Sequence, residues 1–184
     1  TKAQLTVLAG PTAVGKGTVV AALTKRYPTL NVSVSATTRD PRPGELNGVH
    51  YYFVSAQEFD AMIERGDMLE WALVHGKNKY GTPRGPVDEA LAAGKPVLLE
   101  IDLAGARQVR TNRPDAQFIF LAPPSWDELE RRLIGRGTEG PEEQARRLAT
   151  ARIELEAASE FDHVVINDDV ERAVDELARL IGLE

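Results

Sequence analysis

The stretch GPTAVGKGT, residues 10–18, constrains the fold of this chain more than any other part of the sequence. It matches the pattern G-x-x-x-x-G-K at Gly10, Gly15 and Lys16, where the glycines permit a tight backbone whose N–H groups can surround a phosphate. Such a loop works between a buried strand and the positive end of a helix dipole. An apolar run lies directly before it at 5–9, and the residues after it have helical spacing. The sequence therefore predicts a phosphate-binding loop.

Short apolar runs alternate with helical patterns along the rest of the chain. Further strands are expected at 96–101, 116–122 and 163–167, and helices at 103–110, 125–134 and 170–181. This alternation predicts an α/β fold of the P-loop NTPase type, in which helices flank a parallel sheet and ligands bind at the carboxyl ends of its strands.

Two stretches break the alternation. Residues 34–84 are rich in turns and hairpin-like sequence, and residues 125–160 are mostly helical and strongly charged. We interpret both as insertions over the ligand edge of the sheet, the first with mixed structure and the second as a helical lid. The core domain would then consist of 1–33, 85–124 and 161–184.

Composition excludes several classes of protein. The net charge of −6 argues against a nucleic-acid partner, and no run approaches the roughly 18 apolar residues that a membrane span needs. The N-terminal stretch has neither the basic head nor the cleavage site of a signal peptide. The chain has no cysteine, which excludes thiolate metal sites and fits a reducing compartment. We expect a cytoplasmic protein, and the oligomeric state stays open.

Other phosphate-loop proteins fit the sequence less well. The dinucleotide fingerprint G-x-G-x-x-G is absent. A GTPase needs D-x-x-G and N-K-x-D; DLAG at 102–105 satisfies the first, but NKYG at 78–81 ends in glycine where the second has its carboxylate. The GTPase interpretation is therefore disfavoured.

A second group of polar residues lies in the first insertion. Arg39 and Arg42 stand three apart on a turn and can converge on one phosphate group, with the phenol of Tyr51 as a further donor. Taken alone, Arg39 and Arg42 are more simply interpreted as two unrelated arginines on a solvated turn. Glu70 follows in the stretch MLEWALVHGKNKYGTP, where the plain reading is an exposed carboxylate.

The motifs together resemble the guanylate kinase family from about residue 5 to residue 181. The matching stretches are GPTAVGKGT, SATTRDPRPGE.NG..YYF, LEWA…YGTP, LLEIDLAG and VINDD. The resemblance implies an enzyme that transfers a phosphoryl group from ATP to GMP with Mg²⁺, and it makes 34–84 a GMP-binding region.

The resemblance also assigns residues to the two nucleotides. The holders of the GMP phosphate would be Arg39, Arg42, Tyr51 and Tyr80, and the readers of guanine Ser35, Glu70, Thr82 and Asp102. The ATP-binding residues would be Gly10, Pro11, Thr12, Ala13, Val14, Gly15, Lys16, Gly17, Thr18 and Asn167. Asn167 would read the adenine edge, although an Asn-Asp pair after a strand is also a plain turn and helix cap.

The lid carries the remaining catalytic candidates. Arg132 and Arg136 share a helix face, and Arg147 follows the next turn. Each alone reads as a salt-bridged surface residue, but the resemblance makes them clamps on the transferring phosphoryl group, together with Lys16. Gly17 stands where many members of the family have a hydroxyl residue.

The residue after Lys16 therefore offers no hydroxyl to a metal ion, and other ligands are needed. We expect Thr18 and Glu100 near the metal, acting directly or through water. The alternative function is a non-catalytic guanylate kinase-like module that binds phosphopeptides, but such modules generally lose the loop and lid residues that this chain retains.

Overall fold

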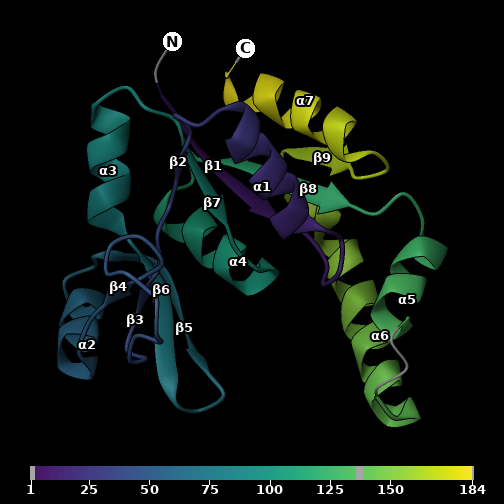
Figure 1. Ribbon diagram of the computed structural model, residues 1–184, viewed down its shortest axis with the longest axis horizontal. Helices are drawn as coiled ribbons and strands as arrows, with labels where there is room; N and C mark the ends of the chain where they lie inside the picture. The colour runs from purple at the N-terminus through teal and green to yellow at the C-terminus, as the bar shows by residue number, and fades with distance from the viewer. Residues whose placement is uncertain (1–2, 136–138, 184) are drawn as a thin grey trace.

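The computed structural model describes residues 3–135 and 139–183. Its centre is a five-stranded parallel sheet in the order β2-β7-β1-β8-β9 (Figure 1). The strands are β1 (Leu5–Ala9), β2 (Asn31–Val32), β7 (Val97–Glu100), β8 (Gln117–Ala122) and β9 (His163–Ile166). The expectation of a parallel sheet flanked by helices is confirmed, and the strands predicted from the apolar runs are all present within one or two residues of their predicted ends.

Helices cover both faces of this sheet because its strands are apolar on both sides. Leu8 packs with α1 (Lys16–Arg26) and α7 (Val170–Ile181), whereas its neighbour Val7 faces α3 (Arg84–Ala92) and α4 (Leu103–Asn112). Two buried layers result, one on each face.

The first insertion forms a second, mixed sheet of order β4-β3-β6-β5 beside the core. Its elements are β3 (Ala36–Thr37), β4 (Tyr52–Phe53), α2 (Ala56–Glu64), β5 (Met68–Val74) and β6 (Asn78–Pro83). The hairpin-like character of the sequence corresponds to the antiparallel pair β5–β6, whereas β3 and β4 pair in parallel.

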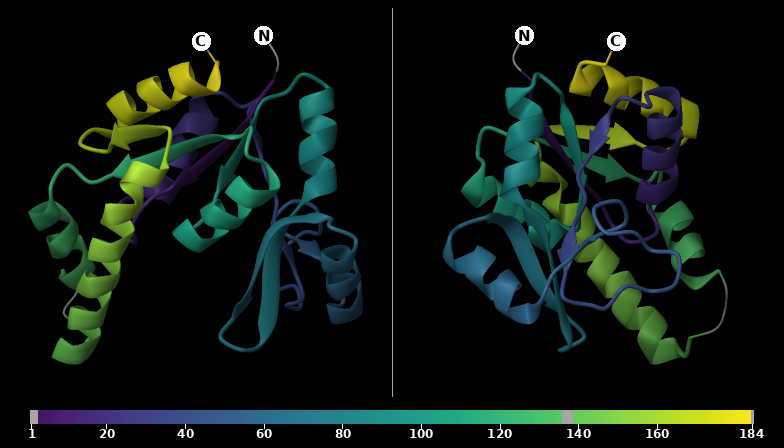
Figure 2. Two further views of the ribbon diagram at one scale, coloured as in Figure 1. Left: turned by 180° about the vertical axis from the view of Figure 1, so that it is seen from behind. Right: turned by 60° about the vertical axis from the view of Figure 1, so that its left-hand side comes forward.

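The second insertion is helical and consists of α5 (Trp126–Ile134) and α6 (Pro141–Glu156), with a short 3₁₀ turn at Ala157–Glu160. Figure 2 shows the helix pair and the mixed sheet as two arms on the same side of the core, while the two termini lie on the opposite side. None of the helices in residues 3–135 and 139–183 is long and apolar enough to cross a membrane.

Candidate active site

The phosphate-binding loop joins β1 to α1, as the sequence predicts. Gly10 approaches the sheet so closely that a Cβ there would lie 2.4 Å from the backbone oxygen of Leu121 in β8. Ala13 and Gly15 have left-handed φ values of 70° and 95°, which turn the backbone around the start of the helix. Left-handed residues that alternate with other conformations can aim successive backbone N–H groups at one point, which is the geometry of an anion site.

Lys16 extends from the first turn of α1 toward the end of β7. Its Nζ donates to the backbone oxygen of Ile101 at 3.2 Å. Burial lowers the pKa of the Lys16 ammonium, and the negative charges of Glu100, Asp102 and Glu154 oppose that shift. The side chain is thus partly desolvated and close to carboxylates from both β7 and the lid.

The predicted holders of the GMP phosphate lie together at the mixed sheet. Arg39 forms a two-pronged ion pair with Glu45, at 2.9 Å and 3.0 Å, and lies 5.2 Å from the centre of the Tyr51 ring. The ring of Tyr80 stands edge-on to Tyr51 at 5.9 Å. The backbone N–H of Arg42 donates to Glu45 at 2.7 Å, whereas its side chain is exposed.

Glu45 therefore organises this turn. The hydrogen bond from Arg39, followed by that from the backbone of Arg42, lowers the pKa of Glu45 to about 2, and the same pair raises the pKa of Arg39. Sequence reasoning missed this role, because a glutamate in a turn carries no local signal of its arginine partner.

Most of the predicted guanine readers line one cavity of about 210 Å³ between the mixed sheet and α4. Its walls include Ser35, Glu70, Tyr80 and Asp102. Thr82 is fully buried and lies opposite Glu70 on the neighbouring strand, and its hydroxyl donates to Glu70 Oε1 at 2.8 Å. In this structure Thr82 orients the carboxylate.

The Glu70 carboxylate is held in an environment that opposes its charge. Burial raises its pKa, the hydrogen bond from Thr82 lowers it, and the charge of Asp102 raises it further. A ligand that donates two hydrogen bonds would offset this cost, because hydrogen bonds to the charged form favour ionisation.

Two residues that the sequence did not single out shape this cavity. A Cβ at Gly105 would lie 3.1 Å from Asp102 Oδ1 and 3.3 Å from Glu70 Oε2, so glycine keeps the space beside both carboxylates open. Gln108 on α4 bonds both backbone groups of Trp71, at 3.0 Å and 2.9 Å, and thereby fixes β5 next to the core. Gln108 has no motif that could reveal this contact.

The two predicted nucleotide sites meet at the carboxyl end of β7. Ile101 accepts the hydrogen bond from Lys16 and also lines the cavity that contains Glu70. Asp102 caps α4 by accepting from Gly105 N at 2.8 Å and faces the same cavity. The loop and the cavity are therefore adjacent.

The lid arginines are placed differently from one another. Arg132 Nη1 donates to the backbone oxygen of Val14 in the loop at 3.2 Å, whereas Arg147 pairs with Glu139 at 2.9 Å and Glu143 at 3.5 Å. Arg136 lies outside the described residues. A cavity of about 370 Å³ is bordered by α5, α6 and the loop, and Arg147 lines it together with Thr12, Leu133, Glu143, Arg146 and Thr150.

Asn167 follows β9 and is 6% exposed. Its side-chain Nδ2 donates to the backbone oxygen of Val14 at 2.9 Å. The structure thus brings Asn167 to the phosphate-binding loop and directs its amide to the backbone of the loop. Its contact with adenine stays a prediction.

The proposed metal ligands, Thr18 and Glu100, are both exposed, and Glu100 is close enough for its charge to act on Lys16. Within the described ranges, no group of three or more His, Cys, Asp or Glu side chains could hold a metal by itself. Mg²⁺ usually takes one or two protein oxygens plus substrate phosphates and waters, so a hydroxyl and a carboxylate fit such an ion.

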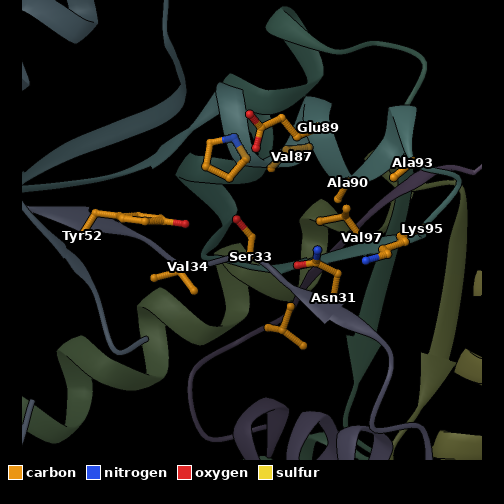
Figure 3. A pocket seen from close by; sticks show the side chains of 12 residues that line it. Asn31, Ser33, Val34, Tyr52, Val87, Glu89, Ala90, Ala93, Lys95 and Val97 are labelled. Carbon is orange, nitrogen blue, oxygen red and sulfur yellow. The ribbon is translucent and has the colours of Figure 1, made fainter. Parts of the chain in front are cut away.

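A further cavity of about 330 Å³ lies away from these residues, between β2, β4 and α3 (Figure 3). Tyr52, Ser33 and Glu89 direct their polar ends toward it, and none of the predicted site residues lines it. It lies where the chain passes from the core sheet to the mixed sheet.

Comparison with known proteins gives a consistent result. The sequence profile described as guanylate kinase matches residues 2–184. The chain is 61% identical to the guanylate kinase of Nocardia farcinica, over 97% of this chain and 93% of that protein. It is 60% identical to that of Streptomyces coelicolor, over 98% of this chain and 91% of that protein.

Solved structures agree with this comparison. The crystal structure of guanylate kinase from Anaplasma phagocytophilum is 31% identical, with a TM-score of 0.72 over 99% of this chain and 86% of that one. Shikimate kinase from Bacteroides thetaiotaomicron, at 15% identity and a TM-score of 0.50 over 97% of this chain and 98% of that one, shares the fold alone.

Proposed function

Because this chain belongs to the guanylate kinase family, we propose that it transfers the terminal phosphoryl group of ATP directly to GMP, giving ADP and GDP. The relatives compared above are all named as kinases, and nothing supports the alternative of a non-catalytic phosphopeptide-binding module. The reaction belongs to guanine nucleotide metabolism.

One observation carries the proposal. Ile101 contacts Lys16 of the phosphate-binding loop and also borders the cavity of Glu70. A triphosphate on the loop and a monophosphate nucleotide in the cavity would therefore place donor and acceptor phosphates side by side. Holding two reactants in this way converts a bimolecular reaction into an effectively unimolecular one.

The acceptor needs no general base in this reaction. The second ionisation of a nucleoside monophosphate lies near pH ~6, so the attacking oxygen is already ionised at neutral pH. The protein's task is to position the phosphates and to compensate charge. On the acceptor, Arg39, Arg42, Tyr51 and Tyr80 would do so. On the donor, the loop residues 10–18 and Lys16 would bind the phosphates.

The lid would complete the site by closing over the donor. Arg132 already reaches the loop, and Arg147 lines the cavity next to it. We assign both, with Arg136, to the transferring phosphoryl group. Closure also excludes water, which would otherwise accept the phosphoryl group.

Specificity for guanine would come from Glu70. Guanine offers its N1–H and 2-amino group as paired donors, which a carboxylate accepts, and its O6 can accept from a hydroxyl such as that of Ser35. Adenine offers no such pair and would leave the partly buried Glu70 carboxylate unpaired. Mismatches of this kind discriminate by about 10⁴-fold.

A divalent metal accompanies ATP in this chemistry, and we propose Mg²⁺ held by Thr18 and Glu100, directly or through water. The ion would neutralise charge on the donor phosphates. We place the reaction in the cytoplasm, since a chain without cysteine fits a reducing compartment.

A substrate panel tests the proposed function. Purified protein with ATP and Mg²⁺ is offered GMP, dGMP, AMP or UMP, and ADP formation is followed by a coupled assay. We expect turnover with GMP to exceed that with AMP and UMP by orders of magnitude. Absence of turnover together with binding of a phosphopeptide would favour the non-catalytic module instead.

A further inference from the structure

The backbone oxygen of Val14 is the meeting point of three segments of the chain. It accepts from Asn167 Nδ2 at 2.9 Å and from Arg132 Nη1 at 3.2 Å. Asn167 comes from the end of β9, and Arg132 from the lid helix α5. A loop carbonyl with two side-chain donors indicates that its orientation is under close control.

The orientation of this carbonyl determines that of the next N–H group. The Val14–Gly15 peptide is trans and planar, so the Val14 C=O and the Gly15 N–H point in opposite directions. The Gly15 N–H has no acceptor in the part of the chain that the structure describes. With the carbonyl held on Asn167, this N–H is left for a phosphate; a flipped peptide would present an oxygen to the phosphate and repel it.

We propose that Asn167 is a positioning residue that fixes the Val14–Gly15 peptide in its phosphate-binding orientation. This role rests on the proposed function of the loop, and it differs from reading the edge of adenine. It also explains why position 15 is a glycine, because a Cβ added there would lie 2.9 Å from Asn167 Nδ2.

Asn167 is better suited to this task than Arg132. Asn167 is 6% exposed, and its own backbone N–H donates to Ala122 at the end of β8 at 2.8 Å. The Arg132 side chain is 37% exposed and also lies 3.5 Å from Glu128 on its own helix. When the lid moves and Arg132 turns to the phosphoryl group, Asn167 keeps the Val14 oxygen paired.

The test uses a ligand that has the phosphates but no base. The affinities for inorganic tripolyphosphate, ATP and GMP are measured by calorimetry on the wild-type protein and on Asn167→Ala and Asn167→Asp. Losing one buried hydrogen bond should lower the affinities for tripolyphosphate and for ATP by the same factor, about tenfold. Asn167→Asp should lose at least as much, because it places an acceptor against the carbonyl. GMP affinity should not change.

Asp168→Asn is the matched control, because Asp168 is the exposed neighbour of Asn167 and pairs with Arg172 on α7. It should bind all three ligands as the wild type does. If the Asn167 variants weaken ATP but not tripolyphosphate, or bind both as the wild type does, the proposal is overturned. Failure of the wild type to bind tripolyphosphate at all would instead contradict the proposed function of the loop.

A measurement on the wild type covers the case in which the variants do not fold. The side-chain amide resonance of Asn167 should be unaffected by adenosine, which has the base but no phosphates, while the Gly15 N–H resonance should shift on adding tripolyphosphate. A shift of the Asn167 amide with adenosine, or no shift of Gly15 with tripolyphosphate, would contradict the positioning role.

Discussion

Replacing Glu70 with glutamine is the sharpest test of how this protein selects its acceptor. Thr82 bonds Glu70 Oε1 at 2.8 Å, which leaves Oε2 beside Gly105 and the cavity. In Glu70→Gln the charge is gone, and at most one acceptor can face guanine. One charge-assisted hydrogen bond from guanine to the carboxylate is lost, which costs about 1.5–3 kcal/mol. The other becomes a bond to a neutral amide, which costs about 1 kcal/mol more. A total of about 3 kcal/mol corresponds to about 10²-fold in kcat/KM for GMP.

The same substitution should not destabilise the fold. Burial raises the pKa of Glu70 in the folded protein. The protonated carboxyl therefore stabilises the fold fully at a pH below the pKa that Glu70 has in the unfolded chain, and this stabilisation disappears as the pH rises through the pKa in the folded protein. At neutral pH its charge is therefore a cost. Glu70→Gln should unfold at the same or a higher temperature than the wild type at pH 7, and this advantage should fade in acid.

The assay compares kcat/KM for GMP and AMP, the affinity for ATP, and the melting temperature. Glu64→Gln, an exposed glutamate at the end of α2, is the matched control and should change none of them. Unchanged selectivity for GMP over AMP in Glu70→Gln would refute the assignment of Glu70 to guanine. A lower melting temperature at pH 7 would refute the electrostatic argument.

Three further predictions concern the charges around the phosphates. Lys16→Met should lower kcat by about 10³-fold or more while calorimetry still detects GMP binding, and retained turnover would contradict the scheme. Because burial lowers the pKa of Lys16 below 10.5, the protonated side chain that binds phosphate should be lost at a pH below 10.5. The pH profile of kcat/KM for ATP should therefore fall on its alkaline side below pH 10.5, and a fall only at or above pH 10.5 would contradict this. Glu45→Gln should release Arg39 from its ion pair and raise KM for GMP by about tenfold, with little change in the affinity for ATP; an unaltered KM would show that the turn holds itself without Glu45.

The core of the fold was predictable because its signals are local. The run at 5–9, the loop and the helix after it follow one another in sequence, and the rule that ligands bind at the carboxyl ends of parallel strands places Lys16 near the end of β7. The strand β2 was missed because two residues carry no periodicity. The parallel pairing of β3 and β4, each of two residues, was hidden for the same reason.

The contacts that orient the site could not be predicted, because they join distant segments. Thr82 meets Glu70 through the register of β5 and β6, and Glu45 holds Arg39 through the path of a turn. Asn167 was chosen from its place after a strand, yet only the folded chain reveals its bond to the Val14 carbonyl. The family resemblance therefore identified the participants, while their partners required three-dimensional structure.

The apolar interior of the described chain is divided into separate groups, and each arm has its own. Ala36, Phe59 and Met68 form a small interior in the mixed sheet, and Leu129, Leu133 and Ala151 form another between α5 and α6. Leu69 of β5 also belongs to the large layer that contains Val7, so the mixed sheet is tied to the core, whereas the interior of α5 and α6 shares no residue with either large layer. The smallness of the lid's interior also makes it the segment that should melt first, so that amide hydrogen exchange is expected to be faster there than in β1 or β8.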